Sequence, residues 1–349
     1  MRHLRYIGKP LLLLTLFFSF TANTYADTPN YQLSATMQGP NIPAFGFWVF
    51  DTSWVDASAH RYYFSDSSNA RVDIFDTDTH QYLNSLSGFT GYHNNSGTKG
   101  PDGLLVDDQH RIWAGDGDST VKVFNQDSLE PITTISTGGK ARADELTYDA
   151  QDHLLAVTNG SEVPPFVSFI DTQTYQVVSR LSIPGANGIE QPHWDPISQH
   201  FLIAIPTTND HPGGEIAVVD PLTRSLLTTY PLPDACQPSG LASGPGRHLL
   251  VGCDGNPVVL DTRNGNVVAT ISQVSSIDQV WYNSGDRRYY LAAGRDPASP
   301  SIGVIDAESL QWLTNIPVAP NSHSVAVDAR TNQVYVPEIG QGIDVYCAQ

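Results

Sequence analysis

Acidic side chains recur at one position of a segment that occurs seven times along the chain. Aligned on their last residue, the segments read FGFWVFD, PDGLLVD, ADELTYD, IEQPHWD, QPSGLAS, IDQVWYN and SHSVAVD. The second position holds a carboxylate in four copies and a histidine in one, and the third position adds the carboxylate of Glu145. In chain order, the second-position residues are Gly46, Asp102, Asp144, Glu190, Pro238, Asp278 and His323.

These residues could form a metal site if the fold brought them together. Several carboxylates beside an imidazole are costly to bury unless they are paired or bound to a metal ion. Oxygen ligands with one imidazole suit Ca²⁺ or Zn²⁺. We therefore predict a divalent-metal site with Asp102, Glu190, Asp278 and His323 as ligands. The alternatives are a solvated acidic funnel, or carboxylates that accept hydrogen bonds from neighbouring backbone N–H groups.

Three residues of the set are candidates for catalysis. A bound divalent ion would polarise the carbonyl group of a lactone or ester. Asp144 or Glu145 would then act as general base, whereas His323 would be the base of a lyase on the same scaffold. Arg142, two residues before Asp144, could neutralise a carboxylate of the set or orient an anionic group of a substrate.

The elements that must position these residues are strands of a repeat. A short β-branched run, followed by an acid or amide and a turn, occurs seven times at intervals of about 41 to 49 residues. This period, with several strands in each repeat, is typical of a β-propeller. We predict an all-β chain of seven four-stranded blades around a central channel; two unrelated β-sandwiches are the alternative. The copies occupy residues 72–76, 121–125, 167–171, 216–220, 257–261, 302–306 and 343–347.

The ring of blades needs one more strand. Six copies of the repeat are followed by an outer strand, but the seventh runs into the C-terminus. The segment Tyr31–Met37 has the pattern of an outer strand and precedes the first full blade. We predict that it pairs with the last blade and closes the ring, because closure removes free sheet edges.

The N-terminus has the pattern of a secretory signal peptide. A basic head precedes an apolar run at residues 11–20 and a small-residue cleavage site at residues 24–26. We predict a signal peptide at residues 1–26, one propeller domain at residues 27–349, and a periplasmic or secreted protein with no membrane insertion after cleavage.

Removing Arg2, Arg5 and Lys9 changes the formal charge from −18 to −21, since Lys+Arg falls from 18 to 15 against 36 acids. This charge argues against nucleic-acid binding and against docking on anionic membranes.

Three cysteines fit an oxidising compartment, namely Cys236, Cys253 and Cys347. The first two flank a predicted hairpin with its turn at residues 244–246, so paired strands would bring them within bridging distance. We predict a disulfide between Cys236 and Cys253, which leaves Cys347 free. The chain has no CxxC pair, which argues against a thiolate zinc site.

The repeat resembles two groups of propellers. The seven-copy pattern V-x-[IV]-[ILF]-[DN] is similar to the YVTN/YncE-like bacterial β-propellers. The segments at residues 100–104 and 111–113 look like those of SMP-30/gluconolactonase and NHL-type propellers. The second resemblance implies one divalent ion at the channel mouth and hydrolysis of a lactone or ester, with Glu190 and Asp278 as the best-matching ligands and Asp102 or Asp144 beside them. The chain departs from that pattern by placing His323 in the ring and by lacking an N-terminal glutamate there.

Two functions follow. One is an exported, metal-dependent hydrolase of the lactonase type. The other is a non-catalytic, YncE-like binding propeller whose acidic mouth takes a small molecule, a metal, a cationic peptide or a partner protein. Convergence of three or more ring acids on one point favours the first, and pairing of those acids with Arg142 and Arg295 favours the second. Neither the substrate nor the oligomeric state follows from the sequence.

Overall fold

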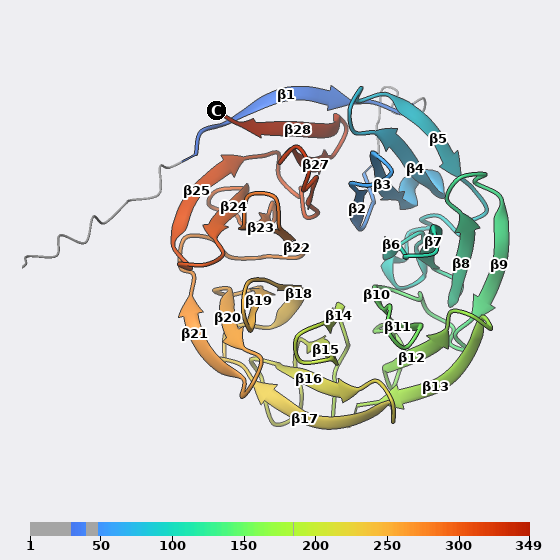
Figure 1. The fold of residues 1–349 in the computed structure, drawn as a ribbon. Helices are drawn as coiled ribbons and strands as arrows, with labels where there is room; N and C mark the ends of the chain where they lie inside the picture. The colour runs from blue at the N-terminus through green and yellow to red at the C-terminus, as the bar shows by residue number, and fades with distance from the viewer. Residues whose placement is uncertain (1–28, 40–47, 184) are drawn as a thin grey trace, which may run out of the picture.

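A computed structural model describes residues 29–39, 48–183 and 185–349. In these residues 28 strands form seven four-stranded antiparallel sheets, which are arranged as blades around one axis (Figure 1). The predicted seven-bladed β-propeller is confirmed. Two 3-10 helices, η1 (Ser67–Asn69) and η2 (Ser96–Thr98), lie in connecting loops. Within the described residues, no helix has the length and apolar character needed to span a membrane. The predicted signal peptide lies outside the described residues.

Each blade runs from the axis outward, so its first strand faces the centre of the ring (Figure 1). Blade 1 is β2 (Ser53–Asp56), β3 (Arg61–Asp66), β4 (Arg71–Asp76) and β5 (Tyr82–Leu86); blade 2 is β6 (Leu104–Val106), β7 (Arg111–Asp116), β8 (Thr120–Asn125) and β9 (Pro131–Ser136). Blade 3 is β10 (Leu146–Asp149), β11 (Leu154–Asn159), β12 (Phe166–Asp171) and β13 (Gln176–Ser182); blade 4 is β14 (Pro192–Asp195), β15 (His200–Ile205), β16 (Glu215–Asp220) and β17 (Ser225–Pro231). Blade 5 is β18 (Pro238–Ser243), β19 (His248–Cys253), β20 (Val258–Asp261) and β21 (Asn266–Thr270); blade 6 is β22 (Val280–Asn283), β23 (Arg288–Ala293), β24 (Ser301–Asp306) and β25 (Trp312–Pro317). Blade 7 is β26 (Ala326–Val327), β27 (Val334–Glu338), β28 (Gly342–Ala348) and β1 (Tyr31–Met37).

The N-terminal strand closes the ring, as predicted. Strand β1 pairs antiparallel with β28, with Met37 opposite Ile343 (Figure 1). The hydroxyl of Thr36 donates a hydrogen bond to Asp344 Oδ1 at 2.6 Å. Met37 is fully buried and packs in the core that blades 1 and 7 share. Residues from both ends of the chain therefore complete one blade.

The repeat signature has a local physical cause. The acid or amide that ends the third strand accepts hydrogen bonds from the backbone N–H groups two and three residues later, as Asp76 does from Asp78 and Thr79 at 3.0 and 2.7 Å. A side chain that bonds the backbone in this way stabilises a tight turn. The same contacts recur at Asn125, Asp171, Asp220 and Asp306. The sequence repeat is thus a repeated turn into the outer strand.

Each outer strand carries a β-bulge. The register with the neighbouring strand shifts around Leu83 in β5, and Leu83 is 47% exposed. A bulge leaves one residue unpaired and twists the strand, which hinders pairing of an exposed edge with another chain. The corresponding residues of the other blades are Ile132, Val178, Leu227, Val268, Leu313 and Ser34.

The hydrophobic core lies between neighbouring blades. Phe169 of blade 3 packs on Phe201 of blade 4 with ring centroids 5.6 Å apart, in a cluster that includes Ala156 and Ile203. The inner strands add to this packing. The residues just before several inner strands lie instead at one end of the central channel, where they line a cavity. These positions can therefore carry polar side chains.

Candidate functional site

The first blade corrects the alignment made from sequence. We expected the innermost strand of blade 1 to end at Asp51, but β2 ends at Asp56. Oδ1 of Asp56 accepts backbone hydrogen bonds from Ser58 and Ala59 at 2.9 and 3.1 Å, as a turn residue at a strand end does. The correct first segment is therefore FDTSWVD, which places Asp51 at the second position. Gly46 and Phe47, which the earlier alignment used, lie outside the described residues.

Residues at the second and third positions of several of the seven aligned segments line a cavity of about 660 Å³, which we call the channel mouth. Most of the ring predicted from sequence lines it. Of the ring residues that the structure describes, Asp102 is the exception, because it is fully buried and does not line the cavity. The titratable acids and the histidine among the lining residues are Asp51, Asp144, Glu145, Glu190, Asp254, Asp278 and His323.

Three of the carboxylates form one group. Asp51, Asp102 and Asp144 each offer an oxygen atom, and these atoms lie within 4.8 Å of one another. Lys99 and Arg142 lie beside them. The Lys99 ammonium contacts Asp51 and is 2.6 Å from Asp102 Oδ1, and Arg142 Nη2 is 2.6 Å from Asp144 Oδ2. Three acids and two cations therefore share one buried cluster, which we call the paired cluster.

The cations set the protonation of the paired cluster. Burial alone would raise the pKa of Asp51, but Lys99 and Arg142 outweigh it and hold that pKa below its usual range. Burial would likewise lower the pKa of Lys99, whereas Asp102 and Asp51 raise it above its usual value. Lys99 is therefore a permanent cation of this cluster.

The paired cluster could hold a metal ion only in place of the Lys99 ammonium. Three carboxylates within 4.8 Å offer the oxygen ligands that a hard cation prefers. Asp102 Oδ2 is also buried without a hydrogen-bond partner among the described residues. However, the Lys99 ammonium already contacts Asp51 and Asp102 and supplies their positive charge. The residues as arranged thus fit an internal ion-pair cluster better than a resident metal ion.

Two further acids in the mouth are buried or half-buried and have no cation partner among the described residues, whereas Asp254 is exposed to solvent. The Glu190 side chain is half-buried and makes no hydrogen bond or ion pair with the described residues, and Glu145 is buried with one contact, from Gln279 Nε2 at 3.2 Å. Burial, followed by the charges of Asp144 and Asp278, raises the pKa of Glu190 to about 8. Burial and neighbouring carboxylates also raise the pKa of Glu145 well above its usual value. These two side chains are the unsatisfied acids of the mouth.

A hydrogen-bonded chain below the mouth holds Glu145 in place. Gln279 Nε2 donates to Glu145 Oε1 and Asp51 Oδ1, each at 3.2 Å. Ser324 donates in turn to Gln279 Oε1 at 2.6 Å, and its hydroxyl oxygen lies 3.0 Å from that of Ser53. Third-position residues from blades 3, 6 and 7 therefore form a floor of amide and hydroxyl groups.

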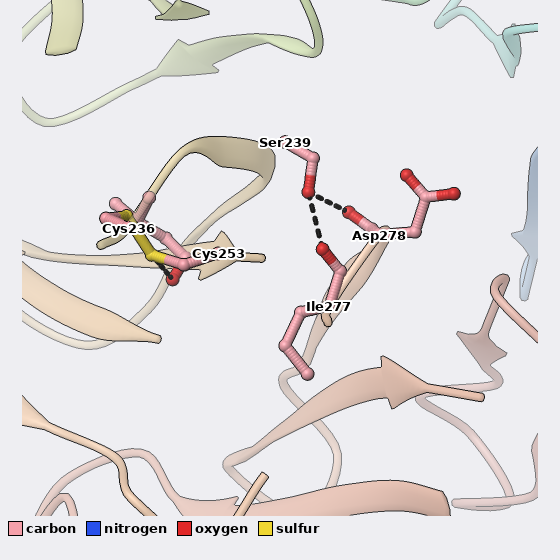
Figure 2. The surroundings of a disulfide bond; sticks show 6 residues. Cys236, Ser239, Cys253, Ile277 and Asp278 are labelled. Carbon is pink, nitrogen blue, oxygen red and sulfur yellow. Dashed lines mark hydrogen bonds between the residues drawn. A yellow bond between two sulfur atoms is a disulfide. The ribbon is translucent and has the colours of Figure 1, made fainter. Parts of the chain in front are cut away.

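Asp278 lies on the opposite wall, paired with a cation. Arg295, in the loop between β23 and β24, is 2.7 Å from Asp278 Oδ2 and is half-exposed. Figure 2 shows the Asp278 backbone carbonyl accepting a hydrogen bond from Ser239, while its carboxylate points away from the nearby disulfide. That disulfide joins Cys236 to Cys253, as predicted, and Cys347 is free.

His323 offers one unused nitrogen. Its Nδ1 donates to the carbonyl of Asn321 at 2.8 Å, and its ring stacks on Phe50 with centroids 4.1 Å apart. Burial lowers its pKa, so the ring is neutral. With Nδ1 carrying the proton, Nε2 is an acceptor, and it has no partner among the described residues. The side chain is 9% exposed and lines the mouth.

The predicted metal ligands thus occupy different places. Glu190, Asp278 and His323 line the cavity, whereas Asp102 belongs to the paired cluster. Among the described residues, the paired cluster is the one group of three or more potential ligands close enough to share an ion. A metal site at Asp102, Glu190, Asp278 and His323 stays a prediction.

Sequence reasoning missed Asp51 and Lys99. Asp51 could have been found by ending the first segment at Asp56, which a turn follows as in the other copies. Lys99 lies three residues before Asp102, much as Arg142 lies two residues before Asp144.

No protein-family model matches the chain, and the search of curated proteins also found no match.

Proposed function

We propose that this protein is an exported binding propeller whose channel mouth takes a positively charged ligand. The observation that carries the proposal is the pair of unsatisfied acids, Glu145 and Glu190, at a cavity that already contains more acids than cations. Seven carboxylates lie in or beside the mouth, with three cations (Lys99, Arg142 and Arg295); the acids are Asp51, Asp102, Asp144, Glu145, Glu190, Asp254 and Asp278. Full ionisation of these acids, with His323 neutral, would leave a charge of −4, since seven minus three is four.

A cationic ligand would relieve this imbalance. Buried carboxylates of like charge repel one another, and each is stabilised by a positive charge within a few ångströms. The pairing of Asp144 with Arg142 and of Asp278 with Arg295 is the arrangement that we expect of a binding propeller. These pairs neutralise Asp144 and Asp278 and leave Glu145 and Glu190 for the ligand.

Export is the second part of the proposal. It rests on the signal-peptide pattern at residues 1–26, and the Cys236–Cys253 disulfide is consistent with an oxidising compartment. Expression of the full chain in a bacterial host, followed by fractionation and N-terminal sequencing, tests it. We expect the extracytoplasmic fraction to contain a chain that begins near Asp27. A chain retained in the cytoplasm with Met1 intact would contradict export.

Binding is tested with matched charged probes. Calorimetric titration of the purified protein with trilysine, and with triglutamate as the opposite-charge control, separates charge recognition from unspecific association. We expect heat from trilysine alone, weakened in Glu190→Gln and unchanged in Glu130→Gln, because Glu130 is exposed and distant from the mouth residues in the ring. Equal binding of both peptides, or of neither, would contradict the proposal.

A metal-dependent lactonase or esterase is the second candidate, favoured by the convergence of Asp51, Asp102 and Asp144 within 4.8 Å. A divalent ion bound there would polarise a substrate carbonyl. In this candidate Asp144 or Glu145 accepts a proton, and the free Nε2 of His323 orients the substrate. Turnover of lactone and ester substrates that is lost on chelation and regained with Ca²⁺ or Zn²⁺ would support it. Absence of metal-dependent turnover would exclude it.

A further inference from the structure

We infer that the ligand of the channel mouth is an organic polyamine, a molecule with two or more amino groups on an aliphatic chain. This inference rests on the proposed function and narrows the expected ligand from any positively charged molecule to one chemical class. It depends on three acceptor groups that the fold leaves without sufficient partners.

The three acceptors come from different blades. Glu145 precedes the inner strand of blade 3, Glu190 precedes that of blade 4, and His323 precedes that of blade 7. Glu190 has no hydrogen bond or ion pair with the described residues, and Glu145 has only its contact with Gln279. Nε2 of His323 is unpartnered although the side chain is nine-tenths buried, with 9% exposed. All three residues line the cavity, so these acceptors are available to a ligand there, and the mouth is complementary to a ligand that donates hydrogen bonds.

The spread of these acceptors argues against a single metal ion. Ligands of one ion lie about 2.3–2.6 Å from it and hence within about 5 Å of one another. Glu145, Glu190 and His323 do not belong to any such group among the described residues. A cavity of about 660 Å³ is instead within the range of about 300–1,000 Å³ that small organic ligands occupy.

The chemistry of the acceptors selects amino groups. An ammonium group carries three donors and no acceptor, which suits carboxylates and a neutral imidazole nitrogen. One ammonium cannot serve acceptors on separate walls, whereas two or three joined by methylene groups can. Apolar side chains between the acids provide surface for those methylenes, since the mouth is also lined by Val49, Phe50, Pro206, Pro238 and Ile339.

The test is a titration series on the purified protein by calorimetry, at constant ionic strength and about pH 8.5, where amines of pKa near that of lysine remain charged. The probes are butylamine, 1,4-diaminobutane, 1,5-diaminopentane, spermidine and CaCl₂. We expect affinity to rise about tenfold or more from the monoamine to the best diamine, and to rise again for spermidine, because each added ion pair contributes.

Variants locate the binding groups. We expect Glu145→Gln and Glu190→Gln each to weaken diamine binding about tenfold, while Glu130→Gln leaves it unchanged. His323→Phe keeps a ring that can stack on Phe50 but removes the Nε2 acceptor, and it should weaken binding as well. Thermal unfolding of each variant confirms that it is folded. If one glutamate variant fails to fold, the other and His323→Phe carry the test.

The outcomes are distinguishable. Butylamine binding as tightly as spermidine, CaCl₂ binding more tightly than any amine, or amine binding that is indifferent to all three variants would overturn the polyamine inference. Binding of trilysine without binding of any polyamine would overturn it too, and would leave the proposed function standing. Failure of every cationic probe would remove both.

Discussion

The Lys99 ammonium lies 2.6 Å from Oδ1 of Asp102, and both side chains are buried beside the channel mouth. The same ammonium contacts Asp51 of blade 1, so one lysine joins the first-blade and second-blade acids. Removing one partner from a buried ion pair leaves an uncompensated charge, which is more damaging than removing both. This relationship makes Lys99 a structural requirement of the mouth.

Lys99→Met should destabilise the protein by about 3–5 kcal/mol. The reason is that Asp102 would keep only Arg142, whose Nη1 is 3.7 Å away, as a nearby cation. Urea unfolding of the wild type, Lys99→Met, and the double variant Lys99→Met/Asp102→Asn measures the effect. We expect the double variant to recover part of the loss. A single variant as stable as the wild type would show that the pair contributes little.

Met37→Ala should weaken the closure of the ring by about 2–4 kcal/mol, because it opens a cavity in the core shared by blades 1 and 7. Leu33 is the matched control: it lies in the same strand but is 54% exposed. We expect Leu33→Ala to change the free energy of unfolding by no more than about 0.5 kcal/mol. Chemical denaturation of both variants measures the difference, and equal effects would mean that β1 contributes no buried contact to stability.

The sequence predicted the propeller because its turns are encoded locally. Asp76 and its equivalents bond the backbone of their own turns, so the repeat is visible without knowledge of distant contacts. Closure by β1 was predictable because the last blade lacked a strand. The disulfide was predictable because a hairpin places Cys236 and Cys253 side by side.

The details of the site were less predictable because they depend on contacts between blades. Lys99 reaches Asp51 over 48 positions of the chain, and Arg295 reaches Asp278 from a loop between two strands. A shift of five residues in the first segment was enough to hide Asp51, since Phe50 and its neighbours read as part of a strand. The repeat shows which residues belong to the ring. The ion pairs depend on which lysine or arginine side chain reaches which carboxylate, and the repeat does not encode this.

The disulfide should stabilise the protein by about 3 kcal/mol, because it closes a loop with a sequence separation of 17. Cys236→Ala/Cys253→Ala should lose this amount in urea unfolding, while Cys347→Ser should behave like the wild type. Thiol titration of the unreduced, denatured protein provides an independent measurement. We expect one reactive thiol per chain, from Cys347; three would show that the bond is absent.

Glu190 should make stability fall as pH rises. Its pKa is about 8 in the folded protein against a usual value of 4.5. Between these values the folded state holds a proton that the unfolded state has lost, so the free energy of unfolding decreases with rising pH across this window. Glu190→Gln removes that contribution. At pH near 4 the variant and the wild type should be equally stable, because the carboxyl is mostly protonated in both states.

Above about pH 8 the variant should be more stable by roughly 1–2 kcal/mol, less than the full value of the pKa shift because the side chain is only half-buried. Urea unfolding at several pH values measures both curves, with Glu130→Gln as the control for loss of a surface carboxylate. The Glu130→Gln curve should run parallel to that of the wild type. If the Glu190→Gln curve is parallel as well, Glu190 titrates normally in the folded protein. In that case the mouth does not hold Glu190 in an unfavourable, unpaired state. That state is the expected source of its affinity for a cation.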